Sequence, residues 1–104
     1  MGLKNLTSED FNEFTKSGVS VIDFYTDWCG PCKIISPIIE QIAKEMKGVK
    51  FAKMDVDKEQ ELARRFEVMS IPTLIFLKNG EQVDMIVGVI SKEEIVKRIK
   101  NISK

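Results

Sequence analysis

Two cysteines three positions apart, Cys29 and Cys32, are the residues of this chain whose type and spacing could carry redox chemistry. They lie in the run Trp28-Cys29-Gly30-Pro31-Cys32, and the 104-residue sequence has no other cysteine. On the first turn of a helix, thiols at i and i+3 have Cα atoms about 5–6 Å apart, which a disulfide tolerates. Unpaired N–H groups and the dipole at a helix start also stabilise a thiolate. The spacing therefore predicts a pair that forms and breaks a disulfide.

The segments on either side must hold this pair in place. Residues 19–26 are β-branched and aromatic and are apolar on both alternating faces, which is typical of a strand covered on both sides. After the cysteines, isoleucines recur at helical spacing through to Gly48, which predicts one amphipathic helix. Residues 49–56 predict a second strand and residues 58–66 a short helix. This order is a parallel β-α-β unit, whose crossover is right-handed in nearly all proteins.

The pattern then changes from parallel to antiparallel. Residues 73–78 and 82–87 are strand-like and are joined by Asn79-Gly80, a strong signal for a tight hairpin. A parallel half followed by a hairpin, with helices between and after the strands, predicts an α/β domain with a mixed sheet and helices on both faces.

The termini complete this domain. Residues 3–7 predict a short edge strand, and acidic residues after Ser8 indicate the start of a helix that Gly18 would end. Near the C-terminus, Ser91 and Glu94 form an S-x-x-E capping box at the start of a helix over residues 92–102. No repeat or linker interrupts the chain, so we expect a single domain over residues 1–104.

Composition excludes several classes of function. The charges of sixteen basic and sixteen acidic residues cancel, so the chain has no excess of positive charge with which to bind nucleic acid or an acidic membrane surface. The apolar runs are too short to span a bilayer, and the polar N-terminus lacks an export signal. We therefore expect a cytoplasmic monomer, in a reducing compartment where a transient, catalytic disulfide fits better than a persistent one.

Two interpretations from other classes stay open beside a redox enzyme. A closed zinc site needs about four ligands, but two cysteines and no histidine allow only a cluster shared between two copies; we expect no metal. A binding protein without redox activity would keep its function after Cys29→Ser and Cys32→Ser. Within the redox class, the chain could instead serve one dedicated client.

The run Trp28-Cys29-Gly30-Pro31-Cys32-Lys33 is identical to the signature of the thioredoxin family. The resemblance continues through Asp23, Pro37, Lys53, Ile71-Pro72-Thr73, Gly80 and Gly88, and covers essentially the whole chain in register. It implies a thioredoxin fold with a mixed five-stranded sheet and four helices. It also implies a general protein-disulfide reductase that acts on oxidised client proteins, is recycled by a thioredoxin reductase, and needs no cofactor beyond its own disulfide. The sequence departs from the family pattern at residues 68–70, Val-Met-Ser, which replace a glycine-containing approach to the Ile-Pro-Thr loop.

The resemblance gives the two cysteines different roles. Cys29, nearest the helix start, is expected to attack the substrate disulfide as a thiolate, and Cys32 to resolve the mixed disulfide. Gly30 and Pro31 would set the redox poise. Oxidising relatives commonly carry a histidine in this dipeptide, and the absence of histidine from this chain favours a reductant.

Asp23 is a carboxylate within an apolar strand, where an unpaired charge costs several kcal/mol and responds by raising its pKa. The resemblance makes Asp23 a buried acid and base that takes the Cys32 proton through water. The alternative is an exposed strand end. Lys53 on the neighbouring strand is either its counter-charge or an ordinary solvated lysine.

A substrate-binding surface is the last expectation. The resemblance implies a cis bond before Pro72, which would present the backbone of Ile71 to an extended substrate for strand addition. The base rate favours a trans bond instead. The surrounding apolar docking surface is expected to contain Trp28, Val56, Ile71, Pro72, Val87 and Gly88.

Overall fold

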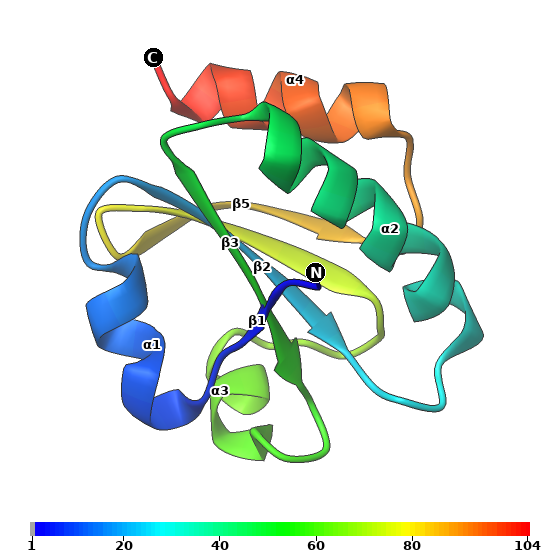
Figure 1. Cartoon of the computed structure of the whole chain (residues 1–104). Coiled ribbons are helices and arrows are strands. Elements are labelled where there is room, and N and C mark those ends of the chain that lie inside the picture. Colours follow the sequence, from blue (N-terminus) through cyan, green and yellow to red (C-terminus); the bar gives the residue numbers. More distant parts are fainter. Residues whose placement is uncertain (1) are drawn as a thin grey trace.

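A mixed sheet of five strands, in the order β1-β3-β2-β4-β5, forms the centre of the computed structural model, which describes residues 2–104 (Figure 1). The strands are β1 (Lys4–Asn5), β2 (Val19–Tyr25), β3 (Val49–Asp55), β4 (Thr73–Lys78) and β5 (Glu81–Val87). The helices are α1 (Ser8–Thr15), α2 (Gly30–Glu45), α3 (Gln60–Arg65) and α4 (Lys92–Ile102). The predicted five-stranded mixed sheet with four helices is confirmed.

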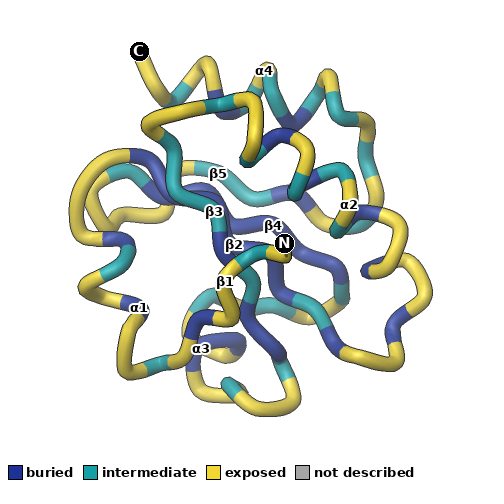
Figure 2. The backbone as a smooth tube through the Cα atoms, viewed as in Figure 1, coloured by how far each residue is buried: buried dark blue, intermediate teal, exposed yellow. Residues whose placement is uncertain are grey.

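The sheet changes direction at its centre. Strand β2 pairs in parallel with β3 and antiparallel with β4, so the β-α-β unit and the hairpin meet at β2. In this register Asp23 has Lys53 as its neighbour on one side and Leu74 on the other. Because helices cover both faces, β2 and β4 are buried along almost their whole length (Figure 2).

The alternation of β2 side chains divides the core into two layers. Ile22 and Phe24 pack with Phe11 of α1 and Leu62 of α3 on one face. Val21 packs on the other face with the isoleucines of α2 and α4. Figure 1 shows α1 with α3, and α2 with α4, on opposite sides of the sheet. The helix that carries the cysteines is therefore anchored by its isoleucines, which are Ile35, Ile39 and Ile42.

The hairpin turn is confirmed, whereas the predicted end of the first helix is wrong. Asn79 and Gly80 have φ of 52° and 85°, the two positive values that a type I′ turn requires. Helix α1 ends at Thr15, three residues before Gly18. The backbone N–H of Gly18 donates to Asn79 Oδ1 at 2.8 Å, and its carbonyl accepts from the Asn79 N–H at 2.9 Å. Gly18 therefore joins the hairpin turn to the start of β2 instead of capping the helix.

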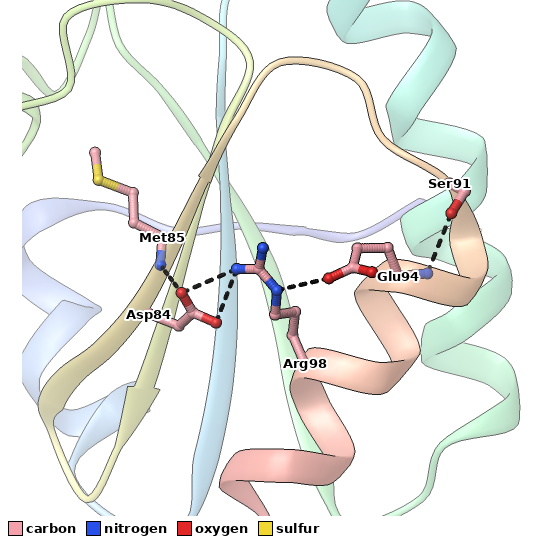
Figure 3. A network of polar contacts seen from close by, with 5 residues as sticks. All are labelled: Asp84, Met85, Ser91, Glu94 and Arg98. Atoms are coloured by element: carbon pink, nitrogen blue, oxygen red, sulfur yellow. Dashed lines mark hydrogen bonds and ion pairs between the residues drawn. The ribbon is translucent and has the colours of Figure 1, made fainter.

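Half of the capping box at α4 forms, and its other half is replaced by an ion pair (Figure 3). The Ser91 hydroxyl accepts from the Glu94 N–H at 3.2 Å, as the motif predicts. The Glu94 carboxylate accepts from Arg98 Nε at 2.8 Å. Arg98 Nη1 also donates to both carboxylate oxygens of Asp84 on β5, at 3.1 and 3.0 Å. Glu94 thus orients the guanidinium that fastens α4 to the edge strand.

Across residues 2–104, no helix combines the length and the apolar character needed to cross a membrane.

Candidate active site

The two cysteines lie at the N-terminus of α2 and are joined by a disulfide. Cys29 is the N-cap, with extended backbone, and Gly30 and Pro31 are the first residues of the helix. Proline suits this position because its missing N–H would have no helical partner there. The Cα atoms are 5.3 Å apart, as the i, i+3 spacing predicts. The proline thus lets the helix begin directly after Cys29.

The position of Cys29 at the helix start favours a thiolate on this residue. Its Sγ accepts from the Cys32 N–H at 3.2 Å, the contact that an N-cap side chain normally makes. The helix dipole places further positive potential at the same sulfur. The exposed fraction is 5 % for Cys29 and 2 % for Cys32, so exposure alone separates them weakly. The capping position distinguishes the two sulfurs more clearly.

Asp23 is fully buried in β2, which removes the alternative of an exposed strand end. Its Oδ2 accepts from the Ser36 hydroxyl at 3.4 Å, and its Oδ1 has no hydrogen-bond partner among the residues that the structure describes. Burial raises the pKa of Asp23 from 3.8 to about 6, while the Ser36 hydrogen bond and the charge of Lys53 lower it. The carboxyl group therefore changes protonation close to neutral pH, as a group that exchanges protons should.

Lys53 is a neighbour of Asp23 in the sheet register, but no ion pair joins them among the described residues. The Lys53 ammonium lies 5.1 Å from the centre of the Tyr25 ring, a cation–π distance. It acts on Asp23 only through its longer-range charge. Lys53 is therefore not a direct ion-pair partner of Asp23, although its charge still lowers the pKa of that carboxyl group.

The loop before β4 has the expected cis bond between Ile71 and Pro72. The Pro72 carbonyl accepts from the Gly88 N–H at 2.8 Å, which ties this loop to the end of β5. Within the loop, the Thr73 hydroxyl donates to the Ser70 carbonyl at 2.6 Å. Because β4 begins only at Thr73, Ile71 precedes the ladder and its backbone lies outside the sheet pairing.

The expected docking residues differ in exposure. Trp28 is 72 % exposed, Val87 is also exposed, and Ile71 and Gly88 are half-buried, so these four can meet a partner. Pro72 is buried, so it supports the loop more than it contacts a partner. Val56 is partly buried against the α1–α3 core layer, and its contribution is packing.

Sequence reasoning missed four residues of this region. Ile34 on α2 and Met69 on the loop before Pro72 are exposed apolar side chains, Met69 at 91 %. Ser36 contacts Asp23, and Asp57 accepts from the Trp28 indole at 2.9 Å. Of these four residues, only Ser36 could have been assigned to the site from the sequence, because it lies four residues after Cys32 and so on the same face of the helix.

A pocket of about 280 Å³ opens beside the disulfide. It is lined by Tyr25, Thr26, Asp27, Cys32, Lys33, Ser36, Pro37, Glu40 and Lys53. A larger hollow of about 590 Å³ lies along α4, remote from the cysteines, and holds no group that does redox chemistry. The described residues include no cluster of three or more side chains able to hold a metal ion. The smaller pocket, with a buried acid behind it, is the one connected to the redox pair.

The geometry defines a class of protein, namely an α/β protein that exchanges disulfides through a dithiol at a helix N-terminus. A sequence profile of the thioredoxin family matches residues 2–101. The thioredoxin of Staphylococcus saprophyticus is 44 % identical over 101 residues, which cover 96 % of this chain and 97 % of the relative. That of Staphylococcus haemolyticus is 46 % identical, over 91 % and 92 % of the two chains.

Solved structures agree with these sequence matches. A mutant thioredoxin from Halobacterium salinarum superposes with a TM-score of 0.91 at 33 % identity, covering 98 % of this chain and 90 % of its own. The thioredoxin of Malassezia sympodialis gives a TM-score of 0.88 at 33 % identity, covering 100 % and 94 %. The chain belongs to the thioredoxin family, and it is a protein-disulfide oxidoreductase.

Proposed function

We propose that the protein is a general protein-disulfide reductase in which Cys29 attacks and Cys32 resolves. The observation that carries this assignment is the hydrogen bond from the Cys32 N–H to Cys29 Sγ at the start of α2. A sulfur that accepts from the helix N-terminus is the one whose thiolate is stabilised, and only the thiolate is nucleophilic. Cys32, inside the first turn, is then close enough to close the intramolecular disulfide.

A trapping experiment tests the order of the two cysteines. In Cys32→Ser, a disulfide-bonded test protein should accumulate as a covalent adduct on Cys29, detectable by mass spectrometry and released by dithiothreitol. The matched control, Cys29→Ser, should form no adduct because the Cys32 sulfur lacks the N-cap position that stabilises a thiolate. An adduct that formed in Cys29→Ser and not in Cys32→Ser would reverse the assignment.

Client proteins bind across the surface between Trp28 and the Ile71–Pro72 loop. An extended client segment pairs with the backbone of Ile71, and its apolar side chains contact Trp28, Val87 and Gly88. The free backbone of Ile71 before β4 supports this docking mode. Clients in which the residue facing Ile71 is N-methylated, and so lacks a donor, should react more slowly than their unmodified counterparts.

Within the site, Asp23 is the base that takes the Cys32 proton, and Lys53 supplies a distant positive charge. Gly30 and Pro31 keep the reduction potential of the Cys29–Cys32 couple low, so the dithiol acts as a reductant. The expected reduction potential is about −270 mV, which is the value known for thioredoxin itself. A potential of about −180 to −120 mV would instead indicate a disulfide donor or isomerase.

Recycling by a thioredoxin reductase completes the function, which is to maintain cell redox homeostasis as a carrier of electrons in the cytoplasm. A dithiol reductant is kept reduced most readily in such a compartment. Membership of the thioredoxin family supports this partner. Turnover of the oxidised protein with an NADPH-dependent flavoprotein reductase and with a ferredoxin-linked reductase would identify the donor. No turnover with either would contradict the proposed recycling step.

A further inference from the structure

Ser36, on helix α2, contacts the buried carboxylate of Asp23. It lies on α2 four residues after Cys32, so the two share the helix face that is turned towards β2. We propose that Ser36 is a positioning residue for disulfide exchange: its hydroxyl holds the Asp23 carboxylate in the orientation and ionisation state that accept the Cys32 proton. This inference rests on the role proposed above for Asp23.

The two carboxylate oxygens of Asp23 are in different environments. Oδ2 accepts from the Ser36 hydroxyl at 3.4 Å, whereas no group in the described part of the chain donates to the buried Oδ1. A buried carboxylate oxygen without a donor is the more basic of the two, because nothing compensates its lost hydration. Anchoring Oδ2 on Ser36 fixes the rotation of the carboxylate and leaves Oδ1 free to receive a proton.

Ser36 also connects Asp23 to solvent. Ser36 and Cys32 both line the 280 Å³ pocket beside the disulfide, whereas Asp23 itself does not. Thr26 lines the same pocket, and its buried hydroxyl, like Asp23 Oδ1, has no hydrogen-bond partner among residues 2–104. The pocket therefore offers several polar groups between Cys32, Asp23 and bulk water, along which a proton can leave after each cycle.

Among the groups around Asp23, Ser36 lowers the pKa of the carboxyl group most and so counteracts the effect of burial. Strand β3 contributes Lys53, and β4 contributes the apolar Leu74. The titratable groups of α2 and of the β2 end that line the pocket are Cys32, Lys33, Glu40, Tyr25 and Asp27. Burial raises the pKa of Asp23 most, and the Ser36 hydrogen bond lowers it more than the charge of Lys53 does. Loss of the hydroxyl should therefore move this titration to higher pH.

The step that depends on Ser36 is the resolution of the mixed disulfide. The Cys32 thiol gives its proton to Asp23, and its sulfur attacks Cys29 Sγ. The Cys29–Cys32 bond forms as the bond from Cys29 to the client sulfur breaks. The electron pair of the broken bond leaves on the client thiolate, which is protonated from solvent, so the client is reduced and the dithiol is oxidised. Asp23 then releases its proton through the pocket.

The test compares Ser36→Ala with Ser36→Thr, which retains the hydroxyl. The pKa of the Asp23 carboxyl is measured by ¹³C NMR in the reduced protein, and the resolution rate is followed against pH from a preformed Cys29 mixed disulfide. In Ser36→Ala, both the pKa and the acidic limb of the rate profile should rise together by about 1 unit, the lower end of the worth of a hydrogen bond to a charged group, because this bond is long at 3.4 Å. At about pH 6 this lowers the rate several-fold, and the deficit shrinks as pH rises. Ser36→Thr should restore both.

An unchanged Asp23 pKa in Ser36→Ala would overturn the inference, and so would a shifted pKa with an unshifted rate profile. The variant Asp23→Asn shows whether a negative result concerns the positioning role of Ser36 or the role of Asp23 as the base. If Asp23→Asn slows resolution while Ser36→Ala shifts nothing, Asp23 is the base and Ser36 does not position it. If Asp23→Asn leaves the rate profile unchanged, the role of Asp23 itself is wrong and the inference falls with it.

Discussion

The indole Nε1 of Trp28 donates to Asp57 Oδ2 at 2.9 Å, although the two residues are 29 positions apart and the Trp28 side chain is 72 % exposed. A large apolar ring at the protein surface would ordinarily sample several rotamers. The bond to Asp57, in the turn after β3, holds the ring beside the disulfide. The proposed docking surface would therefore be partly preorganised before a client arrives, which lowers the entropy lost on binding.

Asp57→Ala should weaken client binding without unfolding the protein, because Asp57 is exposed. We expect KM for a protein disulfide to rise about two- to five-fold, the effect of one lost orienting contact, with a smaller effect on a small-molecule disulfide that does not reach the ring. Trp28 is the only tryptophan, so a fall in fluorescence anisotropy reports its release directly. Asp57→Asn keeps an acceptor oxygen and is the matched control. Unchanged anisotropy in Asp57→Ala would show that the bond does not hold the ring.

Asp23→Asn should stabilise the fold at neutral and alkaline pH. The folded-state pKa of Asp23, about 6, lies above its ordinary value of 3.8, so ionisation costs the folded state stability above that range. A shift of about two units corresponds to about 3 kcal/mol, which the amide recovers in full above about pH 7. The gain should shrink as pH falls through about 6 and vanish below about 4, where the carboxyl is protonated in both states. Urea unfolding at several pH values measures it, and a gain independent of pH would contradict ionisation of the buried carboxyl as its cause.

Arg98→Met should lower the melting temperature by a few degrees at low salt. Arg98 joins Glu94 on its own helix to Asp84 on β5, with two hydrogen bonds to the Asp84 carboxylate (Figure 3). These groups are partly exposed, so screening should reduce the effect in concentrated salt. Arg98→Lys keeps the charge without the planar fork and should recover only part of the loss. Equal melting temperatures for wild type and Arg98→Met would mean that the pair contributes nothing to the docking of α4.

Ser20→Ala should be neutral or stabilising, by up to about 1 kcal/mol. The Ser20 hydroxyl is fully buried in β2 and has no hydrogen-bond partner within residues 2–104, so its removal relieves a desolvation cost. Thr15 is the matched control, because its buried hydroxyl donates to the Phe11 carbonyl at 2.9 Å. Thr15→Val should therefore destabilise by about 1 kcal/mol. A clear loss of stability in Ser20→Ala would show that its hydroxyl is satisfied in solution, for example by a bound water.

The sequence determined the elements of this protein closely. Strand β4 and helix α4 have the predicted bounds, because Asn79-Gly80 and Ser91 are local signals that act within a few residues. The spacing of Cys29 and Cys32 likewise fixed their distance through the geometry of one helical turn. Helix α3 is shorter than the predicted 58–66, since the N–H groups of residues 58 and 59 bond the Asp55 carbonyl in a turn first.

Which side chains contact one another depends on how the elements pack. Ser36 with Asp23, Asp57 with Trp28 and Arg98 with Asp84 come from different elements, and no periodicity predicts such pairs. The same holds for Gly18, which looks like a helix cap in sequence but bonds a hairpin turn 61 residues away. Local signals act through backbone conformation within one turn of chain, whereas these contacts depend on the strand register and on how each helix docks. For that reason the reactive dithiol and the buried Asp23 can be predicted from the sequence, whereas the contacts made by Ser36 and Asp57 cannot.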